Sequence, residues 1–279
     1  MNKFDFLIEL NDAIEKNDGI EGMSFEGFTL NGEKIRNAYF YQCEFNGITF
    51  NNCNLKSARF NRCIFNQCIF EATDLQDVKM VGTVFNGCAM RMVQIDGCEM
   101  EDAQVRNGNW NVVYVMQSNL DMSRMEGLEM RRCMFHGGTL QNMSANDVNF
   151  EDTRFIRTRM SNLRMGNSNL VDTSFDEVAG EEIPNSKFNK CNMINSVFSG
   201  MTVEGVEFRD CRFVHGQFGG SFLQDVDFSG SDLGNSNFRG AKMGRVNFEG
   251  ADISNAIFDQ EDEGGGAQNP YKLATDFFI

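Results

Sequence analysis

Every fifth residue of the chain is apolar over most of its length. Steps of five from Phe25 give 31 consecutive apolar positions that end at Phe175. After a shift of three residues, a second series of 16 apolar positions runs from Ile183 to Phe258. The two series hold 21 of the 27 phenylalanines, although only 41% of all residues are hydrophobic. The pattern therefore reflects a structural repeat and not the composition.

The residues between these apolar positions follow the same period. A small or modest residue usually stands two positions earlier, as at Ala38, Cys43 and Ser196, and the other three positions are mostly polar or glycine. A period of five matches neither the 3.6 residues of a helical turn nor the alternation of a strand. A chain that turns a corner every five residues can bury one large and one small side chain per side. The pattern predicts a solenoid with a polar outer surface.

Three segments show the repeat clearly: Ala58-Arg-Phe60-Asn-Arg62, Ser231-Asp-Leu233-Gly-Asn235 and Ala251-Asp-Ile253-Ser-Asn255. They resemble the repeat of the pentapeptide-repeat family, roughly Ala-Asp/Asn-Leu/Phe-X-X, and the resemblance covers residues 20–258. It implies an all-β fold, a right-handed quadrilateral β-helix with four pentapeptides to a coil. The 47 repeats would form nearly 12 coils. At about 4.8 Å per coil, the rod should be roughly 55–60 Å long.

Residues 1–19 precede the repeat and predict a capping helix. Asn2 is suited to begin this helix, and Asn17-Asp18-Gly19 is suited to end it. Its apolar residues that share one helical face are Phe4, Leu7, Ile8 and Ile14. The open end of a stack of coils exposes strand edges. We therefore expect the helix to cover the first coil with this face.

The register break at residues 176–184 adds three residues to one coil. The added segment must bulge from the coil, and it carries Asp176, Glu177, Glu181 and Glu182. Loops carry function more often than the scaffold that positions them, so these four acids are a candidate partner-binding site. The alternative is an insertion that the solenoid tolerates.

Residues 259–279 follow the repeat as an acidic, glycine-rich linker and a tail peptide. Five acidic or amide residues and Gly264–Gly266 predict flexibility. The apolar end predicts a docking peptide, with Asp276, Phe277, Phe278 and Ile279 as candidate partner-binding residues. The segment Thr275-Asp-Phe-Phe278 resembles the end of sliding-clamp-binding peptides. Alternatively, the tail folds back over the last coil as a C-terminal cap.

The sequence offers no catalytic or metal site. All nine cysteines stand two positions before an apolar centre, in the small inward slot, where cysteine acts as a compact apolar residue. The two histidines fall at outward positions, and no hydrolase, phosphate-binding or metalloprotease motif occurs. We predict a protein that is not an enzyme and that holds no cofactor and no metal.

Hydropathy and charge predict where the protein is located and which partners it does not bind. No apolar run of about 18 residues and no signal peptide is found, which predicts a cytoplasmic location and no membrane contact. The chain has 25 Lys and Arg residues and 40 Asp and Glu residues, and hence a net charge of −15. This charge disfavours direct binding to nucleic acid.

The family resemblance implies a function through partner proteins. Its members include topoisomerase-protecting proteins that mimic DNA and bind DNA gyrase, so a type II topoisomerase is the first expected partner, and a homodimer is left open. Seven outward arginines depart from a uniformly acidic rod: Arg124, Arg131, Arg132, Arg154, Arg157, Arg159 and Arg164. The alternative is a scaffold, adaptor or effector whose tail docks a sliding clamp or a host protein.

Overall fold

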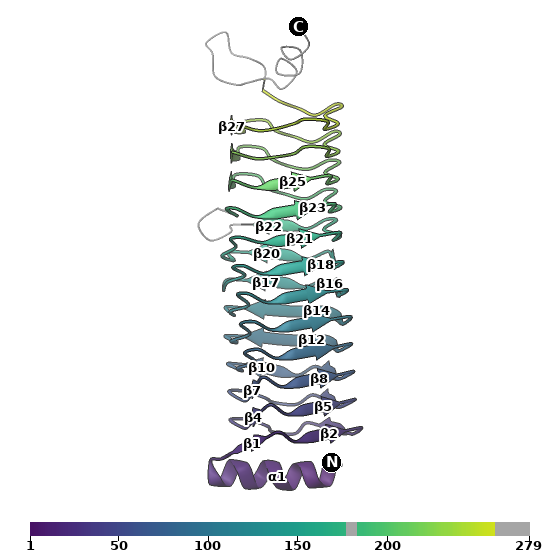
Figure 1. The fold of residues 1–279 in the computed structure, drawn as a ribbon, viewed down its shortest axis with the longest axis vertical. Helices are drawn as coiled ribbons and strands as arrows, with labels where there is room; N and C mark the ends of the chain where they lie inside the picture. Colours follow the sequence, from purple (N-terminus) through teal and green to yellow (C-terminus); the bar gives the residue numbers. More distant parts are fainter. Residues whose placement is uncertain (177–182, 260–279) are drawn as a thin grey trace.

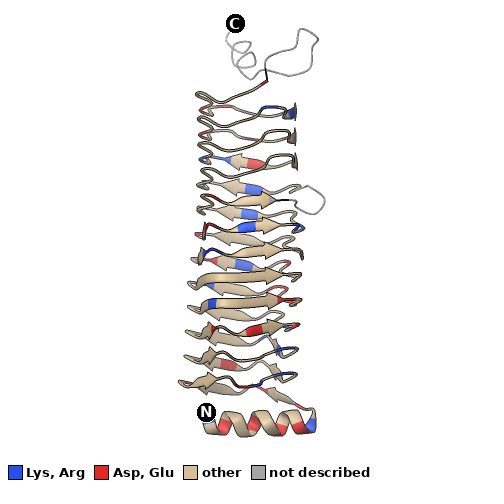
Figure 2. Cartoon of the chain, turned by 180° about the vertical axis from the view of Figure 1, so that it is seen from behind, with Lys and Arg blue, Asp and Glu red and all other residues tan. Residues whose placement is uncertain are grey.

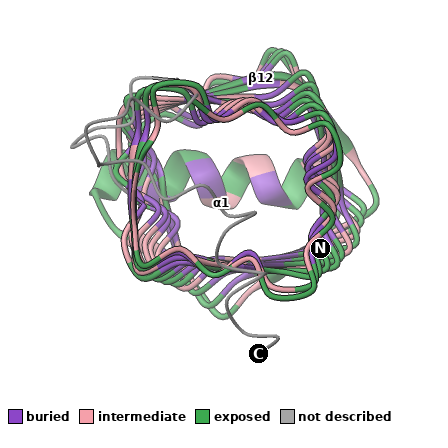
Figure 3. Cartoon of the chain, turned by 90° about the horizontal axis from the view of Figure 1, so that it is seen from above, coloured by how far each residue is buried: buried purple, intermediate pink, exposed green. Residues whose placement is uncertain are grey.

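The chain forms a straight rod of stacked coils (Figure 1). The computed structural model describes residues 1–176 and 183–259. These residues are nearly all β and form a parallel solenoid of about 11 turns, with one short helix at the N-terminus. Seen along its axis, the rod has four walls, and the buried residues line its inside (Figure 3). The predicted quadrilateral β-helix with its N-terminal helix is confirmed.

Each wall is a parallel ladder made of short strands on some coils and of single bridges on others. The first wall contains β1 (Gly19–Glu21), β4 (Tyr39–Tyr41), β7 (Arg59–Asn61), β24 (Thr202–Glu204), β26 (Phe222–Gln224) and β27 (Lys242–Gly244). The second wall contains β2 (Ser24–Glu26), β5 (Glu44–Asn46), β8 (Ile64–Asn66), β11 (Val84–Asn86), β13 (Gln104–Arg106), β15 (Arg124–Glu126), β18 (Ser144–Asn146), β21 (Arg164–Gly166), β23 (Lys187–Asn189) and β25 (Glu207–Arg209).

Two long strands join the third and fourth walls. The third wall contains β3 (Thr29–Asn31), β6 (Thr49–Asn51), β9 (Ile69–Glu71), β16 (Glu129–Arg131) and β19 (Asn149–Glu151). The fourth wall contains β10 (Asp74–Gln76), β17 (Met134–His136), β20 (Arg154–Ile156) and β22 (Ser174–Asp176). Strands β12 (Ala89–Asp96) and β14 (Asn109–Met116) continue around the corner between these two walls.

The register of the ladders follows the period of the sequence. Strand partners lie 20 residues apart, as in Phe45↔Phe65 and Phe65↔Phe85. Across the break, Met165 pairs with Phe188, 23 residues later, and Phe188 then pairs with Phe208 at the usual spacing. The three extra residues thus leave the ladder of the second wall continuous.

The apolar centres form the core. Phe60, Phe65, Phe70 and Leu75 come from four successive walls, and each is at most 1% exposed. The rings of Phe45 and Phe65 stack along the axis, with centroids 4.7 Å apart. Most phenylalanines that follow each other at the strand register stack in the same way, although Phe25 and Phe45 are tilted by 34°. These ring contacts add to the burial of apolar area.

Cysteine, serine or threonine fills many of the small inward slots, and several of these side chains bond to the previous coil. Cys68 Sγ donates to the carbonyl oxygen of Phe45 at 3.2 Å, and Thr73 Oγ1 donates to that of Phe50 at 2.8 Å. All nine cysteines are buried free thiols. The slot therefore favours a small side chain that can satisfy a buried carbonyl.

The helix α1 (Lys3–Lys16) lies across the N-terminal end of the rod (Figures 1 and 3). Asn2 caps its start by accepting a hydrogen bond from the Asp5 N–H at 3.1 Å. It is not long and apolar enough to cross a membrane, and α1 is the one helix of the described residues.

The predicted inner face of α1 was wrong. The residues buried against the first coil are Phe6, Leu10 and Ala13, and the ring of Phe6 meets that of Phe25 edge-on at 4.9 Å. Phe4 is 72% exposed and Ile8 51%, and Ile14 is also exposed, while Leu7 packs at the margin of the core. The helix is apolar on two sides, so periodicity alone could not decide which side would face the coil.

Candidate protein-binding face

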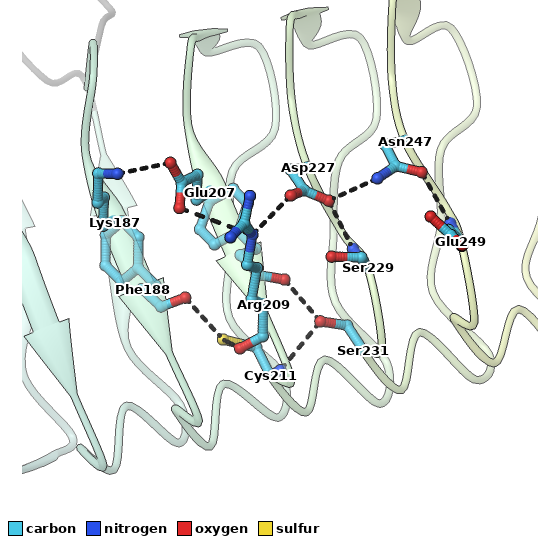
Figure 4. Close-up of polar contacts among 11 residues, drawn as sticks. Lys187, Phe188, Glu207, Arg209, Cys211, Asp227, Ser229, Ser231, Asn247 and Glu249 are labelled. Carbon is cyan, nitrogen blue, oxygen red and sulfur yellow. Dashed lines mark hydrogen bonds and ion pairs between the residues drawn. The ribbon is translucent and has the colours of Figure 1, made fainter.

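The charges of the outer surface alternate in sign along the rod. On the second wall, Lys187 Nζ lies 2.6 Å from Glu207 Oε1, and Arg209 Nε lies 2.7 Å from Asp227 Oδ2 (Figure 4). Asn247 Nδ2 donates to Asp227 at 2.9 Å and continues the chain of contacts. Red and blue residues are accordingly mixed on the face seen in Figure 2. Exposed pairs of this kind contribute little to stability, but they neutralise the surface locally.

The residues outside the described part of the chain carry more negative charge than their small number would suggest. Residues 177–182 and 260–279 carry seven of the acids and one lysine, so these 26 residues hold −6 of the net charge of −15. The described residues hold the remaining −9. The rod itself is only mildly acidic.

The seven arginines between residues 124 and 164 do not form one patch. Arg124 and Arg164 lie on the second wall, Arg131 on the third, Arg154 on the fourth and Arg159 on the first. Arg131 Nε lies 3.2 Å from Glu151 Oε2 on the next coil. The arginines therefore surround the rod as a belt and leave no single basic face.

An apolar surface interrupts this polar exterior on the fourth wall and the corner that precedes it. We call it the Tyr114 face. It lies on β12, β14, β17 and β20, and the residues that form it are Met92, Val112, Tyr114, Met116, Met134 and Ile156.

The strand register makes these residues neighbours. Tyr114 pairs with Met134 on the next coil, and Met116 shares its strand and its outward direction with Tyr114. His136 lies between Met116 and Ile156 in the same column. Met92 is 59% exposed and Tyr114 is 42% exposed, while the other members of the face are partly exposed. Tyr114, Met116 and Met134 are thus direct neighbours, with Met92 and Val112 at the corner beside them, whereas His136 separates Ile156 from Met116.

Two residues of the face occupy a backbone conformation that disfavours them. The corner between the third and fourth walls requires a left-handed residue on every coil, and Asn52, Asn195 and Asn235 supply it elsewhere. Met92 and Val112 stand at the same corner with φ of 52° and 56°. Val112 is the one β-branched residue with positive φ among the described residues.

This choice of residues has an energetic cost. An L-residue in the left-handed region is disfavoured by roughly 1–2 kcal/mol, and a branched side chain is the least suited to it. Asparagine or glycine would relieve that cost at Val112, as they do on other coils. Strained backbone positions tend to occur at functional sites. Among the described residues with positive φ, Val112 is therefore the one whose side chain is least suited to this conformation, and it lies on the Tyr114 face.

The candidate residues predicted from the sequence fall mostly outside the described part of the chain. Asp176 ends β22, where its backbone pairs with Ile156 of the Tyr114 face. Glu177, Glu181 and Glu182 lie outside the described residues, as do Asp276, Phe277, Phe278 and Ile279. The Tyr114 face itself was missed, although its signal was available: apolar residues recur at outward positions with the 20-residue spacing of neighbouring coils.

The buried surroundings of the cysteines indicate a structural role. Burial raises the pKa of Cys98 to about 12 and that of Cys133 to about 11. Cys43 and Cys63 contact each other on adjacent coils. Within residues 1–176 and 183–259, no group of three His, Cys, Asp or Glu side chains is placed to hold a metal ion.

Comparison with known proteins identifies the class. A family model described as a pentapeptide repeat region matches residues 181–258, and a model of nine pentapeptide repeats matches residues 35–79. Together with the four-sided solenoid and its period of five, these matches define a β-helical repeat protein. The chain belongs to the pentapeptide-repeat family.

Solved structures with similar folds share little sequence with this chain. The heterocyst-differentiation protein HetL of the cyanobacterium Nostoc is 12% identical over 92% of this chain and 94% of its own, with a TM-score of 0.35. QnrB1, a plasmid-mediated fluoroquinolone resistance protein, is 15% identical over 93% of this chain and 100% of its own, with a TM-score of 0.29. None of the curated proteins matches the sequence. At these TM-scores the family assignment rests on the family models and the repeat.

Proposed function

We propose that this protein is a non-enzymatic binding rod that holds a partner protein on the Tyr114 face. The observation that carries the proposal is the group of exposed apolar side chains around Met92 and Tyr114, next to the positive φ of the β-branched Val112. The fold does not require an apolar residue at this corner, because other coils build it from residues such as Gly32, Asn52 or Asp152. A contiguous exposed apolar patch on an otherwise polar surface is typical of an interaction site.

The chemistry of the face suits a protein partner. Tyrosine and methionine are enriched at the centres of protein interfaces, where they bury large area at modest cost in conformational freedom. The strands beneath them are held by ladders on both sides, so the face is ordered before it binds. A preorganised face avoids part of the entropic cost of association.

Affinity purification from the native cell tests this proposal. A double variant, Tyr114→Ser with Met134→Ser, should fail to retain a protein that the wild-type chain retains. Phe222→Ser is the matched control, because Phe222 is exposed to a similar degree but stands alone on the first wall. Partners retained equally by the wild type, the control and the double variant would contradict the proposal.

A narrower proposal is that the partner is a type II topoisomerase such as DNA gyrase and that the rod competes with duplex DNA for it. The straight rod and the net charge of −15 support this proposal. The alternation of charges along the walls weakens it, because a DNA mimic should present continuous negative charge. The acids of residues 177–182 and 260–279 would have to supply that continuity.

Purified gyrase separates the two candidate functions. On the narrower proposal, the full chain should bind gyrase at low salt, duplex DNA should displace it, and deletion of residues 268–279 should leave binding intact. No binding at low salt would exclude this partner. Loss of a captured sliding clamp or host protein on the same deletion would instead favour the adaptor function of the tail.

A further inference from the structure

The two ends of the apolar core differ in how well they are covered. At the N-terminal end, Ile20, Phe25, Leu30 and Ile35 of the first coil are at most 3% exposed, because α1 packs on them. At the other end, Met243, Phe248 and Phe258 of the last coil are only partly buried. One coil earlier, the equivalent Leu223, Phe228 and Phe238 are at most 1% exposed.

The geometry of the rings shows which surface is left open. Phe258 stacks on Phe238 with centroids 5.0 Å apart and planes 4° apart, and Phe248 stacks on Phe228 at 5.5 Å. Each ring of the last coil therefore has one side covered by the preceding coil and the other side turned toward the end of the rod. Exposed aromatic surface of this size is unfavourable in water.

The hydrogen bonds between coils change at Asp259, the last described residue before the tail. The Gly220 N–H donates to the carbonyl oxygen of Arg239 on the next coil at 2.9 Å. One coil later, the Gly240 N–H donates instead to the side-chain Oδ2 of Asp259 at 2.8 Å. Asp259 stands at the position equivalent to Arg239, but its side chain accepts this bond in place of its backbone carbonyl. The segment that continues the chain therefore starts at the rim of the open core.

We propose that residues 267–279 dock on the open C-terminal end of the core and cover Met243, Phe248 and Phe258. The occupant is this segment because it starts at the rim and carries matching apolar side chains: Tyr271, Leu273, Phe277, Phe278 and Ile279. The proposal is independent of the Tyr114 face.

The length and charge of the intervening linker fit this placement. Residues 260–266 can span at most about 25 Å, which exceeds the roughly 17 Å of a fully extended five-residue wall. The segment can therefore reach any part of the end. On this proposal, Glu261, Asp262 and Glu263 would remain in water near the rim, and in the sequence the apolar residues follow the three glycines. Because the linker is short, the segment competes at millimolar effective concentration with an external partner for the same surface.

One consequence concerns the tail as a docking peptide. The same phenylalanines cannot cover the core and occupy a partner at once. A protein that captured residues 275–279 would uncover the end of the rod.

Photocrosslinking of the full chain tests the contact directly. With p-benzoylphenylalanine in place of Phe278, we expect the main crosslink to fall on residues 241–259 of the same chain, where Met243 is a reactive target. A mixture of isotopically light and heavy chains distinguishes contacts within a chain from contacts between copies. A main crosslink to a second copy, or to a region remote from the last coil, would overturn the proposal.

Hydrogen exchange measures the protective effect. The double variant Phe277→Ser with Phe278→Ser should raise amide exchange at residues 240–259 at least tenfold and leave residues 40–160 unchanged. The matched control replaces Glu261, Asp262 and Glu263 with their amides, which alters the linker but not the apolar residues. Equal exchange of the last coil in the wild type and the double variant would also overturn the proposal.

Discussion

The middle coils and the C-terminal coils share the same core but differ on the fourth wall. In both regions the centres and the small slots are buried, as at Phe135 and Phe238. At the corner before that wall, however, two of the middle coils carry Met92 and Val112, whereas the C-terminal coils carry the polar residues Asn195, His215, Asn235 and Asn255. Because the repeat recurs on every coil, each residue can be compared with its equivalents on the other coils. Departures from it at outward positions reflect requirements other than folding.

The largest predicted effect tests the shared core. Phe135 stacks on Phe155 at 5.0 Å, and Phe238 stacks on Phe218 at 4.7 Å. Replacing either phenylalanine with alanine should lower the free energy of unfolding by about 3–5 kcal/mol, because the stack prevents the cavity from closing. Urea unfolding of both variants measures this cost. Costs that differ several-fold between the two regions would show that the cores are not equivalent.

The next effect concerns the thiols of the small slots in alkaline solution. An unfolded cysteine has a pKa of about 8.5, whereas burial holds the pKa of Cys133 at about 11. Above pH 8.5 the unfolded state loses a proton that the folded state keeps, so the stability falls as the pH rises toward 11. The serine at position 236 shows that the slot accepts a hydroxyl, since Ser236 Oγ donates to the carbonyl of Phe213 at 2.8 Å.

Cys133→Ser should therefore lose one part of this pH dependence. Between pH 8.5 and 10, its free energy of unfolding should fall by about 2 kcal/mol less than that of the wild type. Urea unfolding at several pH values, under reducing conditions, gives both slopes. Parallel slopes would mean that Cys133 is not protected from ionisation.

Exchanging the corner residues between the two regions measures the energetic cost of an apolar residue with positive φ. Asn235→Val should destabilise the C-terminal coils by about 1–2 kcal/mol, because valine is poorly suited to the left-handed corner. Val112→Asn should stabilise the middle coils by about 1 kcal/mol for the same reason. Thermal unfolding measures both changes. An unchanged or lower stability of Val112→Asn would show that the backbone at Val112 is not strained.

Particular residues show how far the sequence could predict this structure. The period of five predicted that Phe60 and Phe65 are core residues and that Cys68 fills a small slot, because every repeat buries the same two side chains. It could not predict that Phe6, and not Phe4, faces the first coil, since that choice depends on how α1 lies on the end of the rod. The Tyr114 face escaped notice because its members are 20 residues apart and become neighbours only through the ladder.

The smallest expected effect is the one that separates binding from folding. Tyr114 and Phe135 lie on adjacent coils of the fourth wall, but Tyr114 points outward and Phe135 inward. Tyr114→Ser should change the free energy of unfolding by no more than about 0.5 kcal/mol, because the side chain lies on the outer surface and not in the core. The same variant, combined with Met134→Ser, should abolish retention of the partner. A decrease of several kcal/mol in the free energy of unfolding would instead show that Tyr114 stabilises the fold. Its exposure would then not indicate a binding function.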